Sequence, residues 1–215
     1  MLYKYIKKEH LESFLKRGTL KIGTLYEYRN EEELGTVIGD DKEGTHITEL
    51  KSPQGRIIDL ASNSPEAQYF KKHILRPNQQ NSNVKIIMEE GANLIAHTNS
   101  PNYYIFCVTS EYGKEMMKEF NCDRCLEILD PEKFFKAISK VIRHKGAYEG
   151  NFKITYENKT TNYLNPHKIH PVLLKDVKYS KQVEVRAVWS PKKEPKSSLF
   201  INVPKAIKYC REFKP

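Results

Sequence analysis

Apolar and polar side chains alternate most clearly over residues 179–189, and this period of two predicts a β-strand. Successive side chains of a strand point to opposite faces, which would place Gln182, Glu184 and Arg186 together on one face. The other face would be mainly apolar. Pro191 and the charged residues that follow it would end the strand. The pattern therefore predicts a carboxylate and an amide side by side near the end of the chain.

The first 30 residues show three patterns in succession. Residues 2–6 predict a short strand, and apolar positions at helical spacing predict a helix over 8–17 that ends at Gly18. Residues 20–28 then alternate again and predict a second strand. The chain should thus open with a strand, a helix and a strand.

Short strands dominate the prediction for the rest of the chain. Residues 103–110 form the most apolar run and predict a central strand. Asp130 and Pro131 are typical of the first residues of a helix, which we expect to continue to about His144. We also expect a helix near 114–120 and strands at 45–50, 84–89, 93–97, 124–129, 152–157, 173–177 and 198–203.

The order of these elements predicts an α+β fold built mainly from short antiparallel strands with a few helices. Strands and helices do not alternate regularly, so a parallel α/β sheet is not favoured. Segments rich in polar residues near 30–55 and 61–82 are expected to be loop insertions. No internal repeat or linker divides the sequence, so we predict one domain over residues 1–215.

Composition adds a charge argument. The net charge of +9 favours a polyanionic partner such as nucleic acid, or an anionic substrate. A lysine-rich proteome would give the same charge without such a partner. No apolar run approaches the roughly 20 residues of a membrane span, and the N-terminus lacks the core of a signal peptide. We therefore expect a cytoplasmic protein with no membrane partner.

Several common chemistries have no motif in this sequence. We find no Gly-x-Gly-x-x-Gly, no phosphate-binding loop of the Gly-Lys-Ser/Thr type and no Gly-x-Ser-x-Gly. Cys122 and Cys125 form an isolated Cys-x-x-Cys, and His167 and His170 would be needed as the second pair of a zinc site. We expect reduced thiols, no disulfide and no metal.

Gln182 and Glu184 carry the candidate chemistry. An amide and a carboxylate at these positions can hydrogen-bond the hydroxyls of a sugar, and the carboxylate can stabilise positive charge at an anomeric carbon. The alternative is a solvated polar face that contains a pair between Glu184 and Arg186.

Three segments resemble ADP-ribosyltransferase-like domains. Leu2-Tyr3-Lys4-Tyr5, the helix ending at Gly18 and the strand ending in Tyr28-Arg29 are similar to the opening of that family. Cys107-Val108-Thr109-Ser110 resembles the end of its middle Ser-Thr-Ser strand, and Gln182-x-Glu184 resembles its Gln/Glu-x-Glu motif. The resemblance covers both ends and the middle of the chain, and it implies a split-sheet core with NAD as substrate.

The resemblance also implies roles for individual residues. Glu184 would be catalytic, holding the nicotinamide ribose and supporting an oxocarbenium-like transition state, and Gln182 would orient the acceptor. Lys4 stands where the family has His or Arg, and because lysine is not a bidentate equivalent, Arg29 is a candidate to replace it. Ser110 would also contact NAD.

Two tyrosines are candidates for the nicotinamide site. Tyr26 or Tyr28 would stack on the nicotinamide ring, and Tyr28 is also a candidate for the middle Tyr of the His-Tyr-Glu subgroup. The alternative for both is packing in the core of a tyrosine-rich protein.

The resemblance implies an NAD-dependent ADP-ribosyltransferase, an intracellular toxin or defence effector that modifies RNA or DNA and has an antitoxin or other protein partner. The alternative is a non-catalytic, basic nucleic-acid-binding or protein-interaction module of related fold. Two segments interleave basic and aromatic residues and are expected to hold the acceptor, namely Tyr3-Lys4-Tyr5 and Lys178-Tyr179-Ser180-Lys181.

Overall fold

A computed structural model describes residues 1–76 and 84–214 of the chain. The chain divides into two compact units. Unit 1 comprises residues 1–44, 100–157 and 171–215, and unit 2 comprises residues 45–99 and 158–170. The segments that we expected to be insertions thus contribute to both units, because 30–44 belongs to unit 1 whereas 45–55 and 61–82 belong to unit 2.

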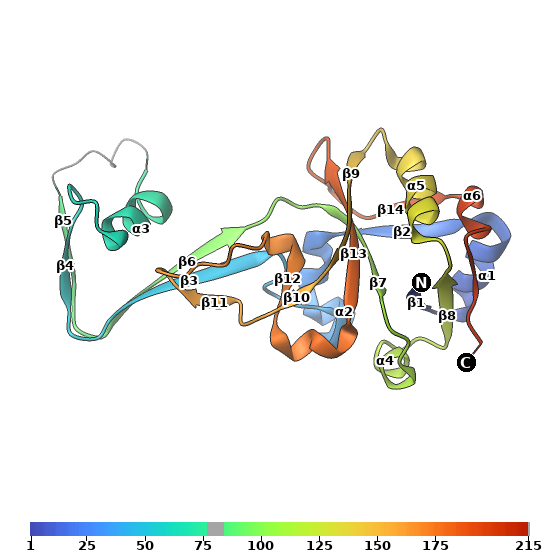
Figure 1. Ribbon diagram of the computed structural model, residues 1–215, viewed down its shortest axis with the longest axis horizontal. Helices are drawn as coiled ribbons and strands as arrows, with labels where there is room; N and C mark the ends of the chain where they lie inside the picture. Colours follow the sequence, from blue (N-terminus) through green and yellow to red (C-terminus); the bar gives the residue numbers. More distant parts are fainter. Residues whose placement is uncertain (77–83, 215) are drawn as a thin grey trace. The chain divides into compact units, whose positions relative to one another are not determined.

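Unit 1 is built on a branched antiparallel sheet (Figure 1). Strand β7 pairs with β13 along its whole length, while its other edge pairs with β2 near its start and with β1 at its end. The sheet therefore divides at β7. The strands are β1 (Leu2–Ile6), β2 (Thr19–Thr24), β7 (Tyr104–Thr109), β8 (Arg124–Ile128), β9 (Gly146–Lys153), β13 (Glu184–Pro191), β14 (Leu199–Asn202) and β15 (Cys210–Glu212).

The two helices with the clearest sequence signals form where they were predicted. α1 (Lys8–Arg17) ends at Gly18, whose φ of 74° is one that glycine adopts without strain. α5 (Pro131–Ile142) begins after Asp130, whose carboxylate accepts the N–H of Lys133. Shorter elements complete unit 1: α2 (Glu31–Ile38), α4 (Lys114–Glu119), α6 (Pro204–Ile207), the 3₁₀ helices η1 (Leu25–Arg29), η3 (Pro171–Leu173) and η4 (Val177–Gln182), and the parallel pair β10 (Thr155–Tyr156) and β12 (Leu174–Lys175).

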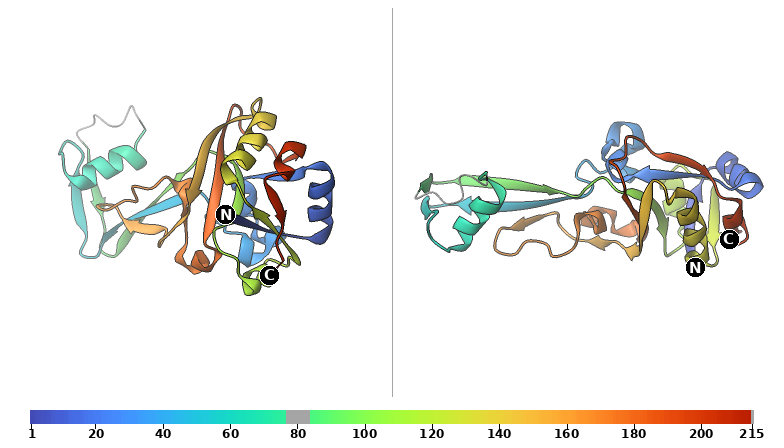
Figure 2. Two further views of the ribbon diagram at one scale, coloured as in Figure 1. Left: turned by 45° about the vertical axis from the view of Figure 1, so that its right-hand side comes forward. Right: turned by 90° about the horizontal axis from the view of Figure 1, so that it is seen from above.

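The main core of unit 1 lies between the sheet and the helices α1, α5 and α6. Trp189 of β13 is fully buried there, and its indole N–H donates to Ser139 Oγ of α5 at 2.9 Å. Four apolar side chains of α5 are buried, and α6 packs beside this helix (Figure 2). The buried residues of α5 are Phe134, Phe135, Ile138 and Ile142.

Unit 2 is also largely antiparallel. β3 (Thr45–Ser52) pairs with β6 (Ala92–Asn99) over eight residue pairs, and β11 (Thr160–Asn162) adds a parallel strand to β3. β4 (Arg56–Asp59) pairs with β5 (Lys85–Met88), and α3 (Pro65–His73) packs against this end of the unit. Both units together confirm the α+β, mostly antiparallel fold that the sequence predicts.

Two local predictions were wrong. The first part of the segment 30–55 is not a loop, because α2 occupies 31–38, whereas the strand predicted at 45–50 forms as β3. The segment 61–82 contains α3, which Ser64 caps by accepting the N–H of Ala67. Residues 77–82 of that segment lie outside the described residues. α2 has no buried residue and α3 carries polar side chains on its exposed face, so both helices look like loops in the sequence.

No helix in the described ranges is long and apolar enough to cross a membrane.

Candidate functional site

Glu184 is the first residue of β13 and lies at a buried position where its side chain is 6% exposed. Its Oε2 accepts a hydrogen bond from Lys175 Nζ at 3.0 Å, and its Oε1 accepts one from Arg186 Nε at 2.8 Å. Its backbone N–H donates to the hydroxyl of Tyr156 at 2.7 Å. The carboxylate is thus fixed between two cations, and this is not the solvated surface pair that we considered as the alternative.

Arg186 connects Glu184 to a second carboxylate. Its Nη1 lies 3.0 Å from Glu43 Oε1 and also donates to the carbonyl of Val172 at 2.6 Å. The side chains of Arg186 and Glu43 are each 1% exposed. Four buried charges therefore alternate in sign from Glu43 through Arg186 and Glu184 to Lys175.

Gln182 reaches this cluster by a route that the alternation did not predict. The strand expected over 179–189 begins only at Glu184, since the preceding residues form η4, which Asp176 caps by accepting the N–H of Lys178. Val183 then adopts a left-handed conformation with φ of 43°. Gln182 and Glu184 meet because both accept hydrogen bonds from Lys175 Nζ, at 2.7 Å and 3.0 Å.

The neighbouring charges decide how these groups ionise. Burial raises the pKa of the Glu184 carboxyl, but the positive charges of Arg186 and Lys175 lower it by more, so the pKa lies below its usual range. Burial lowers the pKa of the Lys175 ammonium, whereas Glu184 and Glu43 raise it, and the net shift is upward. Glu184 is therefore a carboxylate and Lys175 an ammonium at neutral pH.

A cavity of about 250 Å³ opens onto this cluster. Its charged lining groups are the cations of Lys4, Lys175 and Arg186 and the single carboxylate of Glu184, so its net charge is positive. An anionic or polyhydroxylated ligand would suit such a site. The remaining lining residues are mainly aromatic or apolar: Tyr3, Tyr5, Tyr28, Leu34, Ile38, Cys107, Val108, Thr109, Phe120, Cys122 and Gln182.

Two of the predicted NAD-binding residues lie in this cavity with Glu184 and Gln182. Lys4 Nζ donates to the carbonyl of Cys107 at 2.8 Å and lies 5.0 Å from the centre of the Phe106 ring. The Tyr28 ring lies against Gly23, where a Cβ atom would come within 2.9 Å of it. A side chain at position 23 would therefore displace Tyr28.

Three other predicted residues do not belong to the described lining of the cavity. The Arg29 guanidinium stacks 3.8 Å from the Tyr26 ring centre, and its Nε donates to the carbonyl of Glu43 at 2.7 Å. The Tyr26 hydroxyl donates to the carbonyl of Ser100 at 2.5 Å, and Ser110 Oγ donates to the carbonyl of Val183 at 3.4 Å. Arg29 therefore supports the loop that carries Glu43.

The strand predicted over 20–28 ends at Thr24, which changes the surroundings of both tyrosines. Thr24 caps η1 by accepting the N–H of Glu27, while the Glu27 carboxylate accepts the N–H of Thr24. This reciprocal cap turns the chain into a 3₁₀ helix. Tyr26 and Tyr28 then point in different directions, which the alternating pattern could not predict.

A second cavity adjoins the first. It has a volume of about 360 Å³, and its lining includes Lys7, His10, Lys21 and the exposed ring of Phe200. The two cavities share five lining residues: Lys4, Tyr5, Tyr28, Leu34 and Cys122. Lys4 thus lies where a ligand extending from one cavity into the other would pass.

Sequence reasoning missed two members of the site. Lys175 stands in an otherwise apolar run, Leu173-Leu174-Lys175, and a lysine in such a run is a usable signal for a buried charge. Glu43 has no comparable signal, because it follows acidic residues in a polar loop. Only the tertiary pairing with Arg186 distinguishes Glu43 from its neighbours.

The cysteines show no metal site. All four are free thiols, and burial raises the pKa of Cys107 and Cys125 to about 12. Within the described part of the chain, no group of three or more His, Cys, Asp or Glu side chains is placed to hold a metal ion.

Comparisons with protein-family models, curated proteins and solved structures found no match.

Proposed function

We propose that this protein is an NAD-dependent ADP-ribosyltransferase and that the cavity at Glu184 binds NAD. The observation that carries the proposal is the joint presence of Glu184, Gln182, Lys4 and Tyr28 in one cavity, although these residues come from distant parts of the sequence. They are four of the residues for which the family resemblance implies a role.

The charge and size of the site support a dinucleotide. NAD carries two phosphates, and the cations of Lys4, Lys175 and Arg186 outnumber the single carboxylate of the first cavity. Ligand sites usually measure about 300–1,000 Å³. The first cavity is smaller than this range, and the second is near its lower limit. The adjoining cavities provide more room, with Lys4 at their shared boundary.

Glu184 would act on the bond between the ribose C1′ and the nicotinamide nitrogen. This bond breaks with its electron pair moving to nicotinamide, which leaves as a neutral molecule. The acceptor then forms a bond to C1′ and loses a proton to water. Positive charge develops on the ribose in between, and a fixed carboxylate stabilises that charge more than it stabilises the ground state.

The ion pairs of Glu184 are compatible with this role. An ionised carboxylate has about four lone-pair positions. Lys175 and Arg186 occupy one on each oxygen, and the Cys107 thiol also hydrogen-bonds to this carboxylate. The remaining positions can accept hydroxyl groups of the ribose. The two cations also hold the carboxylate ionised and in one orientation, which lowers the reorganisation that the reaction requires.

The test is release of nicotinamide from NAD by the purified protein, with and without cell extract, together with transfer of label from the adenylate phosphate. Glu184→Gln should lower the rate on the order of 100-fold or more, since it removes the charge and keeps the shape. Glu12→Gln changes an exposed carboxylate of α1 and serves as the matched control. Equal rates for wild type and Glu184→Gln would contradict the proposal.

The buried cations favour one alternative, a non-catalytic module of related fold. Lys175 and Arg186 offset the charge of Glu184, and a site that only binds an anionic ligand would need them as well. Titration calorimetry separates the two functions. NAD binding without nicotinamide release, in the presence of extract, would support the binding module.

We further propose a nucleic acid as acceptor, in a cytoplasmic toxin or defence effector, because the net charge is +9. After labelling, extract is treated with nuclease or protease. Loss of label with nuclease alone is expected, whereas loss with protease alone would show a protein acceptor and would point to a protein partner.

The surface that we predicted for the acceptor needs correction. Tyr179 is 5% exposed, and its hydroxyl donates to the carbonyl of Gly39 at 2.8 Å, so this ring cannot stack on a base. Tyr5 is 8% exposed and packs against Phe120. Because the rings of Tyr5 and Tyr179 are buried in the protein interior, they offer little surface on which a base could stack.

A further inference from the structure

A groove with five lysines lies between α5 and α6 in unit 1. It has a volume of about 390 Å³, and its described lining contains no acidic side chain. All five lysines are exposed. They are Lys133, Lys136 and Lys140 of α5, Lys205 of α6 and Lys208, which directly follows α6.

The spacing on α5 aligns three of these cations. Lys133, Lys136 and Lys140 stand at positions i, i+3 and i+7, so they lie along one face of the helix. The row spans about 10 Å at 1.5 Å per residue. A row of this length faces more than one phosphate of an extended polynucleotide strand.

Most of this positive charge is not compensated. Lys133 forms an ion pair with Asp130 at 2.7 Å. The other four lysines of the groove have no ion pair with any acidic side chain among residues 1–76 and 84–214. Like charges in one groove repel each other, and a polyanion would relieve this repulsion.

The floor of the groove offers contact surface between the cations. Ala137, Val141 and Tyr209 line it, and Lys208 Nζ lies 5.0 Å from the centre of the Tyr209 ring. Val141 is 37% exposed. Apolar side chains beside cations suit the sugar and base of a nucleotide as well as its phosphate.

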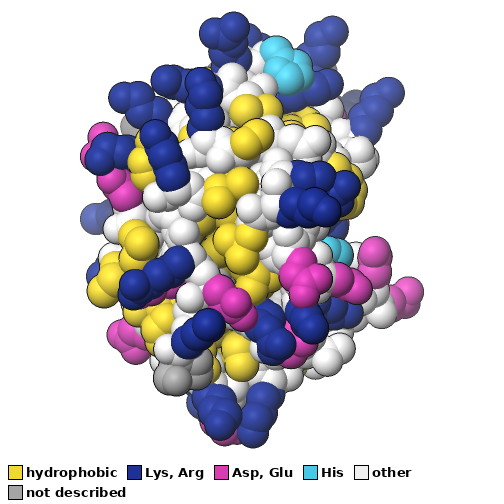
Figure 3. All heavy atoms as spheres, turned by 90° about the vertical axis from the view of Figure 1, so that its right-hand side faces the viewer, with side chains coloured by type: hydrophobic (Ala, Val, Ile, Leu, Met, Phe, Trp, Pro, Cys, Tyr) yellow, Lys and Arg dark blue, Asp and Glu magenta, His cyan; other side chains and the backbone are white. Residues whose placement is uncertain are grey.

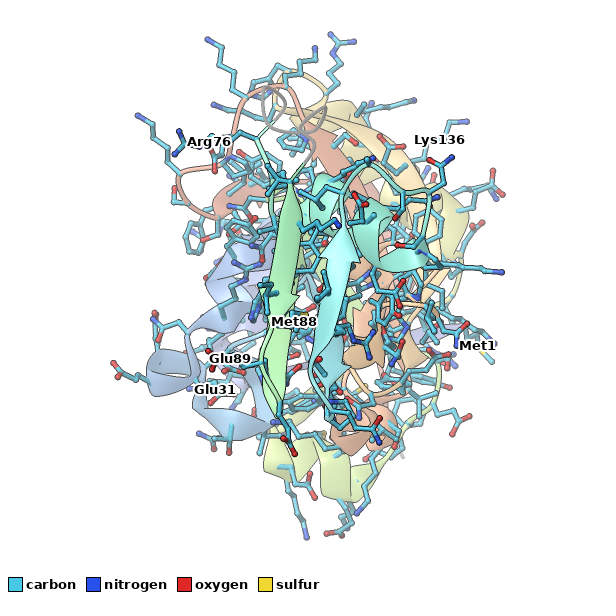
Figure 4. The ribbon with its side chains drawn as sticks, turned by 90° about the vertical axis from the view of Figure 1, so that its left-hand side faces the viewer. Met1, Glu31, Arg76, Met88, Glu89 and Lys136 are labelled. Carbon is cyan, nitrogen blue, oxygen red and sulfur yellow. The ribbon has the colours of Figure 1, made fainter. Side chains whose placement is uncertain are left out.

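The space-filling view shows this distribution. Figure 3 faces the side of unit 1 that carries α1, α5 and α6, and in its upper half dark blue side chains surround a strip of hydrophobic ones. In the opposite view of Figure 4, the labelled Lys136 extends outward at the edge of the protein. The lysines are therefore accessible to a large partner.

We propose that this groove binds the phosphate backbone of single-stranded nucleic acid. An anionic membrane surface would also attract lysines, but membrane-binding helices insert an apolar face. The four largest apolar side chains of α5 are buried against the sheet, which leaves only Val141 as a large apolar side chain of this helix for insertion. The inference extends the proposed function, which requires a nucleic acid near the protein, but the binding itself does not need NAD.

The experiment measures binding of a fluorescent 20-nucleotide oligothymidylate by polarisation, without NAD, over a range of salt concentrations. The variant Lys136→Ala/Lys140→Ala/Lys205→Ala removes three groove cations. The variant Lys16→Ala/Lys114→Ala/Lys193→Ala removes three exposed lysines of unit 1 outside the groove and has the same net charge.

We expect the groove variant to lose roughly tenfold or more in affinity, and the control to change little. The dependence of log affinity on log salt should become shallower by about two for the groove variant, because each phosphate contact on a single strand contributes about 0.7. The single variant Lys140→Glu should weaken binding in the same direction, and circular dichroism checks that each variant is folded.

Three results would overturn the inference. They are equal losses in both triple variants, unchanged oligonucleotide binding in the groove variant, or groove-dependent binding to phosphatidylserine vesicles without oligonucleotide binding. Nicotinamide release without acceptor separates this inference from the proposed function. That rate should be unchanged in the groove variant, so failure of one proposal does not imply failure of the other.

Discussion

Arg186 and Glu43 form an ion pair of 3.0 Å although they lie 143 positions apart in the sequence, and each side chain is 1% exposed. The same guanidinium holds Glu184 through its Nε. This pair therefore attaches the loop before β3 to the strand that carries the candidate catalytic carboxylate. Arg186 also holds the Glu184 carboxylate in position and helps to keep it ionised.

The first prediction follows from this pair. Glu43→Ala leaves Arg186 buried with one carboxylate fewer, and breaking a buried ion pair by removing one partner costs about 3–5 kcal/mol. We expect a loss of this order in the free energy of unfolding, measured in urea. Glu43→Gln keeps a hydrogen-bond acceptor and should lose less.

The double variant Glu43→Leu/Arg186→Met is the control for this prediction. If the loss comes from an uncompensated buried charge, removing both charges should cost less than the sum of the two single variants. Additive losses would show that the two side chains act independently of each other.

The second prediction concerns acid stability. Because the folded-state pKa of Glu184 is lowered, by Arg186 and Lys175 acting against burial, its contribution to stability is present above its unfolded pKa of about 4.3. This contribution is lost as the pH falls from there towards the folded-state pKa. The wild-type free energy of unfolding should therefore fall below about pH 5 more steeply than that of Glu184→Gln. Parallel curves from urea unfolding at pH 3–7 would contradict this assignment.

The sequence predicted elements where the signal is local. Gly18 indicates the end of a helix, and the pair Asp130-Pro131 indicates the start of one. Both signals depend on only one or two residues, and both predictions were correct. Alternation failed at two places where a side-chain cap bends the chain into a 3₁₀ helix. Thr24 caps η1 and Asp176 caps η4, and both caps lie inside runs that look like strands.

The site was predicted only in part for a related reason. Glu184 was singled out because it alternates with apolar residues and because Gln182-x-Glu184 resembles a Gln/Glu-x-Glu motif. Glu43 contacts Arg186, which is distant in the sequence, and Lys175 contacts Gln182 across a turn of the chain. Contacts of this kind produce no periodic pattern in the sequence. Tyr28 and Arg29 are adjacent in the sequence, yet one lines the cavity and the other supports a loop.

The third prediction concerns Cys107, which lines the cavity beside Glu184. Burial and then the negative charge of Glu184 raise the pKa of this thiol to about 12. Only the thiolate reacts quickly, so iodoacetamide at pH 8 should alkylate Cys107 far more slowly in the native protein than in urea. Peptide mass spectrometry over time measures both rates. Rapid alkylation of Cys107 in the native protein would show that this thiol is reactive and would contradict the prediction.

The last prediction concerns His46 in unit 2. His46 is 8% exposed, and its Nε2 is buried without a hydrogen-bond partner in the described structure. Burial, followed by the nearby His167, His170 and Lys159, lowers the pKa of its imidazole to about 4. The ring centre of His167 is 4.9 Å away.

The sign of the effect follows from this shift. An unfolded histidine has a pKa of about 6.5, so between about pH 6.5 and 4 the unfolded chain binds a proton that the folded chain does not. This residue should therefore lower the stability of unit 2 progressively as the pH falls through that window. At pH 7 and above the contribution is absent, because the imidazole is neutral in both states.

Nuclear magnetic resonance of the imidazole C–H groups measures the pKa directly, and urea unfolding at pH 7.5 and 5 measures the consequence. His46→Asn should be less sensitive to pH than the wild type. His167→Gln removes one nearby imidazole and should raise the pKa of His46 modestly, since burial remains the larger cause. A His46 pKa above 6 would show that the ring is hydrated or has found a partner, and the pH dependence of unit 2 would then have another origin.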